Sequence, residues 1–305
     1  MQVISKNKDA RACVATIGTF DGVHRGHRYV LRQVIDSARE KGLDSVVVTF
    51  ANHPLRVLRP GVHPQMLTLE EEKVELLQAV GVDTVVLLDF TEDLARMNAS
   101  DFMRTVLKDR LNVKELIVGY DNHIGHDRRG FDDCRHDGES MGIVVKGSDE
   151  LKAEEAVSST EIRQALLAGN VDEANRLLGY PFFIKGTVIE GFQNGRKLGY
   201  PTANLQVDPN KLIPKNGVYF VNTEYGFGML NVGTRPTLHN GRQRSIEVHV
   251  FDFDDSLYGK PVRMELLCWL RGEKEFDSLL SLRGQLEEDE KQCRQLMAQM
   301  ESKGV

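Results

Sequence analysis

Two histidines lie three residues apart in a glycine-rich stretch, GTFDGVHRGH, which runs from Gly18 to His27. An apolar run precedes it and helical spacing follows it, so it predicts a turn that leads from a strand into a helix. The first turn of such a helix exposes backbone N–H groups that bind phosphate. His24 and His27 can donate to phosphate oxygens, and Gly26 lets the backbone come close. These residue types favour nucleotidyl transfer, in which preplaced donors stabilise charge at the α-phosphate.

A second run, GRKLGYPTANL, offers oxygen ligands near the middle of the chain. Pro201 fixes a turn, and the hydroxyl of Thr202 and the amide oxygen of Asn204 lie two positions apart on an expected strand edge. Such oxygens can hold Mg²⁺ together with nucleotide phosphates. The alternative is a turn that the Thr and Asn side chains merely stabilise through the backbone.

The elements that position the first run predict a doubly wound α/β domain. Expected strands at 12–18 and 45–50 flank an expected helix, which is a β-α-β unit, and further strands are expected at 84–90, 115–119 and 142–147. Thr68 and Glu71 have capping-box spacing for a helix that ends at Val80, and Ser100 can cap a helix that reaches Leu111. The histidine turn thus falls at the carboxyl edge of a parallel sheet, where such sheets bind ligands. This position favours a ligand site over the alternative of two solvent-facing histidines.

The second half of the chain predicts an antiparallel β-barrel. Two short helices are expected at 159–169 and 171–179, and five strand-like segments then follow with only Gly- and Asn-containing turns between them. A long amphipathic helix from about 276 to 300 closes the chain. We therefore predict two domains, 1–178 and 179–305.

Composition narrows the class of protein. The chain has 305 residues, of which 41% are hydrophobic and 28% charged, as expected for two globular domains. The net charge of −6 weighs against a nucleic-acid partner. No apolar run approaches the roughly 20 residues of a membrane span, and the start lacks a signal-peptide pattern, so we expect a cytoplasmic protein with no membrane partner. Four cysteines without a CxxC pair are expected to be free thiols.

The motifs resemble those of one enzyme family. GTFDGVHRGH resembles the HxGH motif of nucleotidyltransferases in the form typical of bifunctional FAD synthetases, and TFANHP, VGYDNHIGHDRRG and SSTEIR resemble further motifs of that family in the same order. The resemblance implies an FMN adenylyltransferase domain joined to a riboflavin kinase domain. It implies His24 and His27 as catalytic residues and His53 and Asp121 as flavin contacts. The ATP contacts that it implies are Gly18, Phe20, Asp21, Gly26, Ser159, Thr160 and Arg163.

The second run resembles the GxxxGxPTAN-like sequence of riboflavin kinases. By position, this resemblance implies that Thr202 and Asn204 hold Mg²⁺ and ATP, with Gly195 and Lys197 as further ATP contacts. SIEVHVFDF resembles the strand that bears the family's catalytic glutamate, which makes Glu247 the expected base. NVGTRPT and SLYG also match, and we expect them to shape the barrel and its flavin pocket. The expected ligands are riboflavin, FMN, FAD and ATP, with Mg²⁺ as cofactor.

Three positions depart from the family pattern. Asn52 stands where the family usually has proline, and Asn122 and Ile124 stand where it usually has aromatic residues. The adenylyltransferase flavin pocket could therefore be altered. Besides the bifunctional enzyme, two alternatives follow: a riboflavin kinase with a weakened adenylyltransferase domain, and a non-catalytic flavin-binding regulator.

The segment around Ile124 also raises the question of zinc. Its potential ligands lie along an expected polar loop and lack the paired spacing of structural zinc sites, so we expect no zinc there. These potential ligands are His123, His126, Cys134 and His136.

Overall fold

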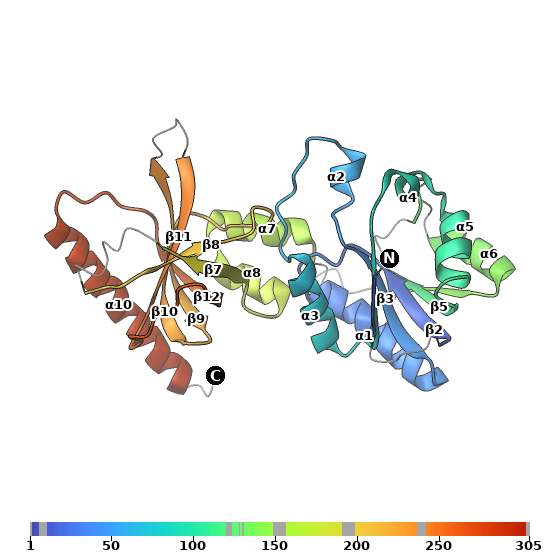
Figure 1. Cartoon of the computed structure of the whole chain (residues 1–305). Coiled ribbons are helices and arrows are strands. Elements are labelled where there is room, and N and C mark those ends of the chain that lie inside the picture. The colour runs from blue at the N-terminus through green and yellow to red at the C-terminus, as the bar shows by residue number, and fades with distance from the viewer. Residues whose placement is uncertain are drawn as a thin grey trace. The chain divides into compact units, whose positions relative to one another are not determined.

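The computed structural model describes residues 2–5, 11–119, 124–127, 129, 131–148, 157–190, 199–236 and 242–302. Two compact units make up the chain, Met1–Ser159 and Thr160–Val305 (Figure 1).

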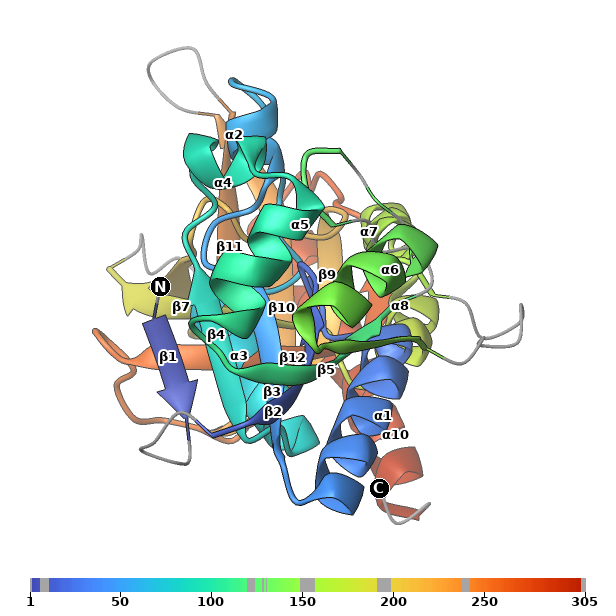
Figure 2. The same ribbon diagram turned by 90° about the vertical axis from the view of Figure 1, so that its right-hand side faces the viewer.

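A six-stranded sheet forms the centre of the first unit, in the order β1-β4-β3-β2-β5-β6 (Figure 2). Its strands are β1 (Gln2–Ser5), β2 (Cys13–Ile17), β3 (Asp44–Phe50), β4 (Thr84–Leu88), β5 (Val113–Val118) and β6 (Val144–Gly147). All pair in parallel except β1, an edge strand that the sequence did not predict and that runs antiparallel to β4. The predicted α/β architecture is confirmed.

Helices cover both faces of this sheet (Figure 1). On one face, Val34 and Ala38 of α1 (Arg25–Lys41) pack on Val14 and Ile117. The other face packs against residues of α5, the π-helix η1 and α6, among them Phe102. Burial on both faces explains why β2 and β4 are apolar at nearly every position. The remaining helical segments of this unit are α2 (Leu55–Leu58), α3 (Glu70–Val80), α4 (Glu92–Arg96), α5 (Ala99–Phe102), η1 (Met103–Lys108) and α6 (Phe131–Met141).

The predicted capping box of α3 was wrong. The helix begins one residue later than expected, and Glu72 accepts from the backbone N–H of Leu69 at 2.9 Å. The hydroxyl of Thr68 instead accepts from the N–H of Gly22, 2.9 Å away. A tertiary partner therefore takes the hydroxyl that the local spacing had assigned to the helix.

Two further local predictions in this unit were wrong. The cap before α5 is Asn98, which accepts from the N–H of Asp101 at 2.8 Å, and the expected single helix to Leu111 is divided into α5 and η1. Part of the expected polar loop is helical, since Cys134 and His136 lie on α6. Buried Cys134 anchors that helix in the core, which the polar composition of the segment concealed.

The second unit is a closed antiparallel barrel with strand order β10-β11-β8-β7-β12-β9, which confirms the predicted fold. Its strands are β7 (Phe183–Ile189), β8 (Ala203–Gln206), β9 (Gly217–Thr223), β10 (Gly226–Pro236), β11 (Arg242–Val250) and β12 (Pro261–Arg271). Helices α7 (Ser159–Ala168) and α8 (Val171–Leu178) precede it, and α10 (Leu279–Ser302) follows it.

Helix α8 is fastened to the barrel by one side chain. Asn175 donates to the carbonyl of Leu266 at 2.8 Å and accepts from the N–H of Phe182 at 2.7 Å. This explains why α8 falls in the same compact unit as the strands. The division of the functional domains at 178/179 stays a prediction.

The closing helix α10 packs along the barrel (Figure 1). The one cysteine of this helix, Cys293, is fully buried and packs in the cluster around Phe220 and Met229. Arg271 at the end of β12 donates through two nitrogens to Asp289, with distances of 2.7 to 3.0 Å, and the Asp289 side chain is 2% exposed. This bidentate ion pair fixes the helix against the strand.

Asp289→Ala is therefore expected to destabilise the second unit by about 3 kcal/mol, because it leaves the Arg271 charge without its buried partner. Urea unfolding followed by fluorescence of Trp269, the single tryptophan, measures this. Glu287→Ala on the same helix removes only the exposed pair with Arg283 and is expected to cost less than about 0.5 kcal/mol. Equal losses in the two variants would contradict a structural role for the buried pair.

Candidate functional site

The turn that carries the two histidines has a strained backbone. Phe20 and Val23 have φ of +48° and +35°, a region that residues with side chains seldom adopt. Asp21, 1% exposed, holds this turn. Its carboxylate accepts from the N–H groups of Leu67 at 3.2 Å and Thr68 at 2.9 Å, and from the Thr68 hydroxyl at 3.2 Å. Asp21 was predicted as an ATP contact. In the structure its carboxylate binds the protein's own chain at Leu67 and Thr68, and the contact with ATP stays a prediction.

The imidazoles of His24 and His27 stack with ring centroids 3.6 Å apart. His24 is the N-cap of α1, and its Nδ1 accepts from the N–H of His27 at 3.4 Å, which leaves Nε2 to carry the proton. The ring of Phe20 meets that of His27 edge-on at 5.1 Å. Nδ1 of His27 is buried and has no hydrogen-bond partner in the described part of the chain. Buried polar atoms are normally paired, so this orphan nitrogen points to a ligand.

His27 stays uncharged at neutral pH. Desolvation lowers its pKa well below the usual value, and the nearby His24 and Lys73 lower it further. A neutral imidazole keeps one N–H donor, which suits a group that binds a phosphate oxygen.

Glycines make room for this packing. A Cβ on Gly26 would lie 3.3 Å from the His24 ring and 3.4 Å from the carbonyl of Val157, and one on Gly18 would lie 3.2 Å from the Phe20 ring. Both were predicted as nucleotide contacts. In the structure they also allow the aromatic cluster to close.

Ser159 connects the SSTEIR segment to the histidine turn. Its hydroxyl donates to the carbonyl of Asp21 at 2.9 Å, at the point where α7 begins. Thr160 and Arg163 follow on the first two turns of this helix, within the second compact unit. The predicted contacts of Ser159, Thr160 and Arg163 with ATP stay predictions.

A largely apolar cavity of about 550 Å³ opens beside the carboxyl ends of β2 and β3. Gly18 contributes to it, as does Ile124, one of the positions that depart from the family pattern. Sequence reasoning missed most of its wall, including Phe50 and Phe90, whose rings meet edge-on at 5.1 Å. The available signal was an aromatic residue at or near the end of two strands, Phe50 at the end of β3 and Phe90 shortly after β4.

Asn52 bridges the two loops that bear these aromatic rings. Its side-chain amide donates to the carbonyl of Phe90 at 3.0 Å and accepts from the N–H of Phe90 at 2.7 Å. The proline that the family usually has at this position could make neither bond. The departure at Asn52 thus holds the cavity wall in place.

His53, predicted as a flavin contact, stabilises the start of α2. Its Nδ1 accepts from the N–H of Leu55 at 3.1 Å, and Leu55 and Leu58 of this helix line the cavity. Asp121 and Asn122 lie outside the described residues, so the flavin contact predicted for Asp121 stays a prediction.

Metal ligands are not assembled around Cys134 in the described residues. Burial raises the pKa of its thiol to about 11, with the neighbouring Asp137 and Asp133 adding to the effect, so the thiol keeps its proton. No group of three or more His, Cys, Asp or Glu side chains with metal-binding geometry occurs among the residues that the structure describes. His126 lines the apolar cavity, and His123 lies outside the described residues.

In the barrel, strand pairing brings two of the predicted kinase residues together. Glu247 on β11 lies directly opposite Asn204 on β8, so their side chains are neighbours on one face of the sheet. On its other side, Glu247 pairs with Asn231 of β10, a residue of the NVGTRPT motif, which was expected only to shape the barrel and its flavin pocket. The carboxylate therefore stands between two amides.

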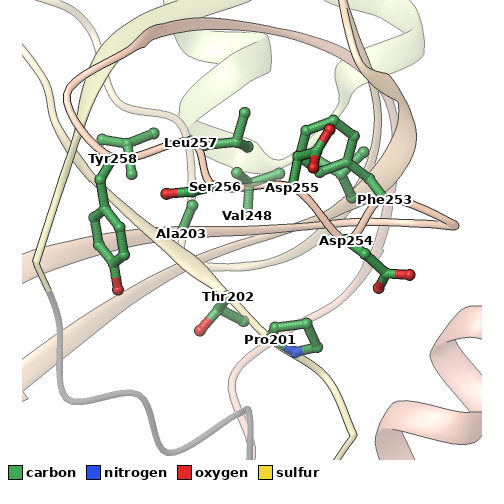
Figure 3. A pocket seen from close by; sticks show the side chains of 12 residues that line it. Pro201, Thr202, Ala203, Val248, Phe253, Asp254, Asp255, Ser256, Leu257 and Tyr258 are labelled. Atoms are coloured by element: carbon green, nitrogen blue, oxygen red, sulfur yellow. The ribbon is translucent and has the colours of Figure 1, made fainter.

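Thr202 lines a separate cavity of about 320 Å³ (Figure 3). Ala203 and Val248, the neighbours of Asn204 and Glu247 along each strand, line it from the opposite face of the sheet. Ser256, Leu257 and Tyr258 of the SLYG motif close another side, as Figure 3 shows. The predicted ATP contacts Gly195 and Lys197 lie outside the described residues.

In the described residues, no helix is long and apolar enough to span a bilayer.

Comparisons with known proteins agree with this arrangement of two units. The sequence profile of the FAD synthetase family matches residues 6–161, and that of the riboflavin kinase family matches residues 178–297. A bifunctional riboflavin kinase/FMN adenylyltransferase of Pseudomonas fluorescens is 38% identical over 94% of each chain. The protein of that name from Bacillus subtilis (strain 168) is 35% identical over 94% of this chain and 93% of its own.

A solved structure extends the similarity to three dimensions. A Streptococcus pneumoniae protein, described as a macrolide-efflux protein, superposes with a TM-score of 0.85 and 34% identity over 95% of this chain and 96% of its own. It shares the fold of both units. With two matching family profiles and relatives aligned over nearly their whole length, this chain belongs to the family of bifunctional riboflavin kinase/FMN adenylyltransferases.

Proposed function

We propose that this chain makes FAD in two ATP-dependent steps, phosphorylation of riboflavin in the barrel and adenylylation of FMN in the α/β unit. The observation that carries the proposal is the presence of a different phosphate chemistry in each unit: the Asn204–Glu247 pair in one and the stacked histidines with an orphan nitrogen in the other. Transfer of a γ-phosphoryl group and attack at an α-phosphate need different geometries, so two sites in two units suit two reactions.

In the barrel, Glu247 acts as the general base. It accepts the proton of the ribityl 5′-hydroxyl while that oxygen attacks the γ-phosphorus of ATP, and ADP leaves. The side-chain amide of the neighbouring Asn204 provides a polar environment for the Glu247 carboxylate, and its oxygen can serve as a metal ligand. Thr202 lines the neighbouring cavity, whose walls include Val248 on the other face of the sheet from Glu247.

Asn204 and Glu247, neighbours on one face of the sheet, offer oxygen atoms that suit a magnesium ion arriving with ATP. The hydroxyl oxygen of Thr202 and the amide oxygen of Asn204 are hard ligands of the kind Mg²⁺ accepts alongside phosphate oxygens and water. When bound, the ion neutralises phosphate charge. Magnesium dependence of both reactions and a cytoplasmic location are parts of this proposal.

In the α/β unit, a phosphate oxygen of FMN attacks the α-phosphorus of ATP, and pyrophosphate leaves. Nε2–H of His24 and the neutral ring of His27 bind the α-phosphate oxygens as negative charge builds up on them. Ser159, the last residue of the same compact unit, adds a hydroxyl beside the histidine turn.

We place the isoalloxazine ring of FMN in the 550 Å³ cavity beside the histidine turn. The rings of Phe50 and Phe90 can pack against the flavin. Asn52 fixes the segment after β3 to the segment after β4 through its hydrogen bonds to Phe90. A cavity that Ile124 lines, with a wall that Asn52 stabilises through Phe90, favours the bifunctional enzyme over a kinase with a weakened first domain.

Glu247→Gln tests the kinase step. The amide keeps the shape but cannot take the proton, so conversion of riboflavin to FMN is expected to fall at least about 100-fold. Chromatography of flavins after incubation with ATP and Mg²⁺ measures this, and conversion of added FMN to FAD should persist in the same variant. Unchanged FMN formation would remove Glu247 from the mechanism.

His24→Ala tests the adenylylation of FMN and is expected to spare the kinase step. It removes an α-phosphate donor and the cap of α1, so FAD formation from FMN is expected to fall about 100-fold while FMN formation from riboflavin continues. Wild-type protein that binds flavins but forms neither product would instead support the non-catalytic regulator.

Asn52→Ala tests the placement of the flavin. Loss of both bonds to Phe90 is expected to raise the KM for FMN in FAD formation about 5- to 30-fold, because each hydrogen bond stabilises the cavity wall by about 1 kcal/mol. Asn52→Asp keeps only the acceptor and should give an intermediate KM. The KM for riboflavin in the kinase reaction serves as the control. An unchanged KM for FMN in Asn52→Ala would place the flavin elsewhere.

A further inference from the structure

A buried lysine on α3 ties together the two loops that lead into the adenylyltransferase site. Lys73 is 4% exposed, and its Nζ donates to the carbonyl of Phe50 at 2.6 Å and to that of Thr19 at 3.4 Å. Phe50 is the last residue of β3 and opens the loop that carries Asn52 and His53. Thr19 belongs to the histidine turn that follows β2. One ammonium group thus joins the carboxyl ends of two neighbouring parallel strands.

The charge of this lysine costs stability at its position. An ammonium group loses its hydration when buried, and two carbonyl oxygens replace only part of it. A methionine would fill similar space without that cost, and carbonyls alone do not require a full positive charge. A charge that is retained in such a place calls for a reason beyond packing.

The location of Lys73 supplies that reason. Its positive charge acts on His27, whose orphan Nδ1 points to a ligand, and it lies within electrostatic reach of Asp21 in the same turn. Both loops that it holds are at the edge of the sheet where the nucleotide and the flavin are proposed to meet. The ammonium can therefore act on the reacting phosphate through the loops it orders and through its field.

We infer that Lys73 is a positioning residue for FMN adenylylation, which sets the distance between the histidine turn and the flavin loop and keeps a resident positive charge beside the histidine pair. The inference rests on the adenylyl transfer proposed above. It assigns Lys73 no contact with substrate and no role in riboflavin phosphorylation.

If Lys73 has this role, its titration should appear in the pH dependence of FAD formation. Desolvation lowers its pKa to about 8, against the opposing effects of Asp21 from the turn and Glu70 from its own helix, while His27 of α1 is neutral. A lysine with a lowered pKa loses its charge as the pH rises through that value. FAD formation should therefore decline above about pH 8, whereas FMN formation, whose residues lie in the other unit, should show no decline from this group.

The experiment compares Lys73→Met, Lys73→Gln and Lys73→Arg with the wild type, and both half-reactions are assayed separately from about pH 6 to 9.5. Both Met and Gln remove the charge, although Gln keeps a hydrogen-bond donor. Because the role depends on the charge, both variants are expected to lower kcat for FAD formation about 100-fold with the KM for ATP little changed. Arginine keeps its charge at high pH, so the alkaline decline should disappear in the residual activity of Lys73→Arg. Lys108→Met, at an exposed position on η1, is the matched control and should retain both activities.

Three outcomes would be decisive in different ways. If the wild type makes no FAD from FMN, the proposed function fails before Lys73 is tested. If the wild type makes FAD and Lys73→Met stays within about threefold of it, or if Lys73→Arg keeps the alkaline decline, the inference is overturned. If Lys73→Met does not fold in the first unit, the wild-type profile decides: a decline near pH 8 in FAD formation alone supports the inference, and its absence overturns it.

Discussion

The buried carboxylate of Asp21 holds the turn between β2 and α1 in a conformation that a free chain avoids. Positive φ at residues such as Phe20 and Val23 costs on the order of 1–3 kcal/mol each. The three hydrogen bonds that Asp21 accepts from Leu67 and Thr68 offset this cost. Without that conformation, His24 could not cap α1 and stack on His27. The proposed adenylyltransferase site therefore depends on a carboxylate that binds the protein's own chain.

The two units bring functional groups together by different physical means. In the parallel sheet, the carboxyl ends of β2, β3 and β4 lie at one edge, so loops that are far apart in sequence converge there. In the barrel, the register of the antiparallel strands brings the residues together, because cross-strand pairing places Glu247 between Asn204 and Asn231. A shift of one residue would turn Glu247 to the opposite face of the sheet. The first site is thus sensitive to loop geometry and the second to strand register.

Asn52 shows how a motif can change while its structural task remains. Proline restricts the chain through its ring, whereas asparagine fixes the same loop by two hydrogen bonds to the backbone of Phe90. The restraint moves from a covalent ring to a tertiary contact. A departure from a family pattern is therefore weak grounds for inferring a lost site until its partners are known.

The sequence by itself determined the class of each unit, the elements that bear the motifs, and the identities of His24, His27, Asn204 and Glu247 as candidates. Periodicity, glycine turns and motif spacing are local properties, which a sequence displays directly. Only the tertiary structure decided which of these residues meet. It revealed Lys73, which no local pattern distinguished, and the contact between Phe50 and Phe90. The capping box wrongly predicted at Thr68 shows the reason, because the Thr68 hydroxyl accepts a hydrogen bond from Gly22, 46 positions away. Burial and distant partners are set by packing rather than by neighbours in sequence.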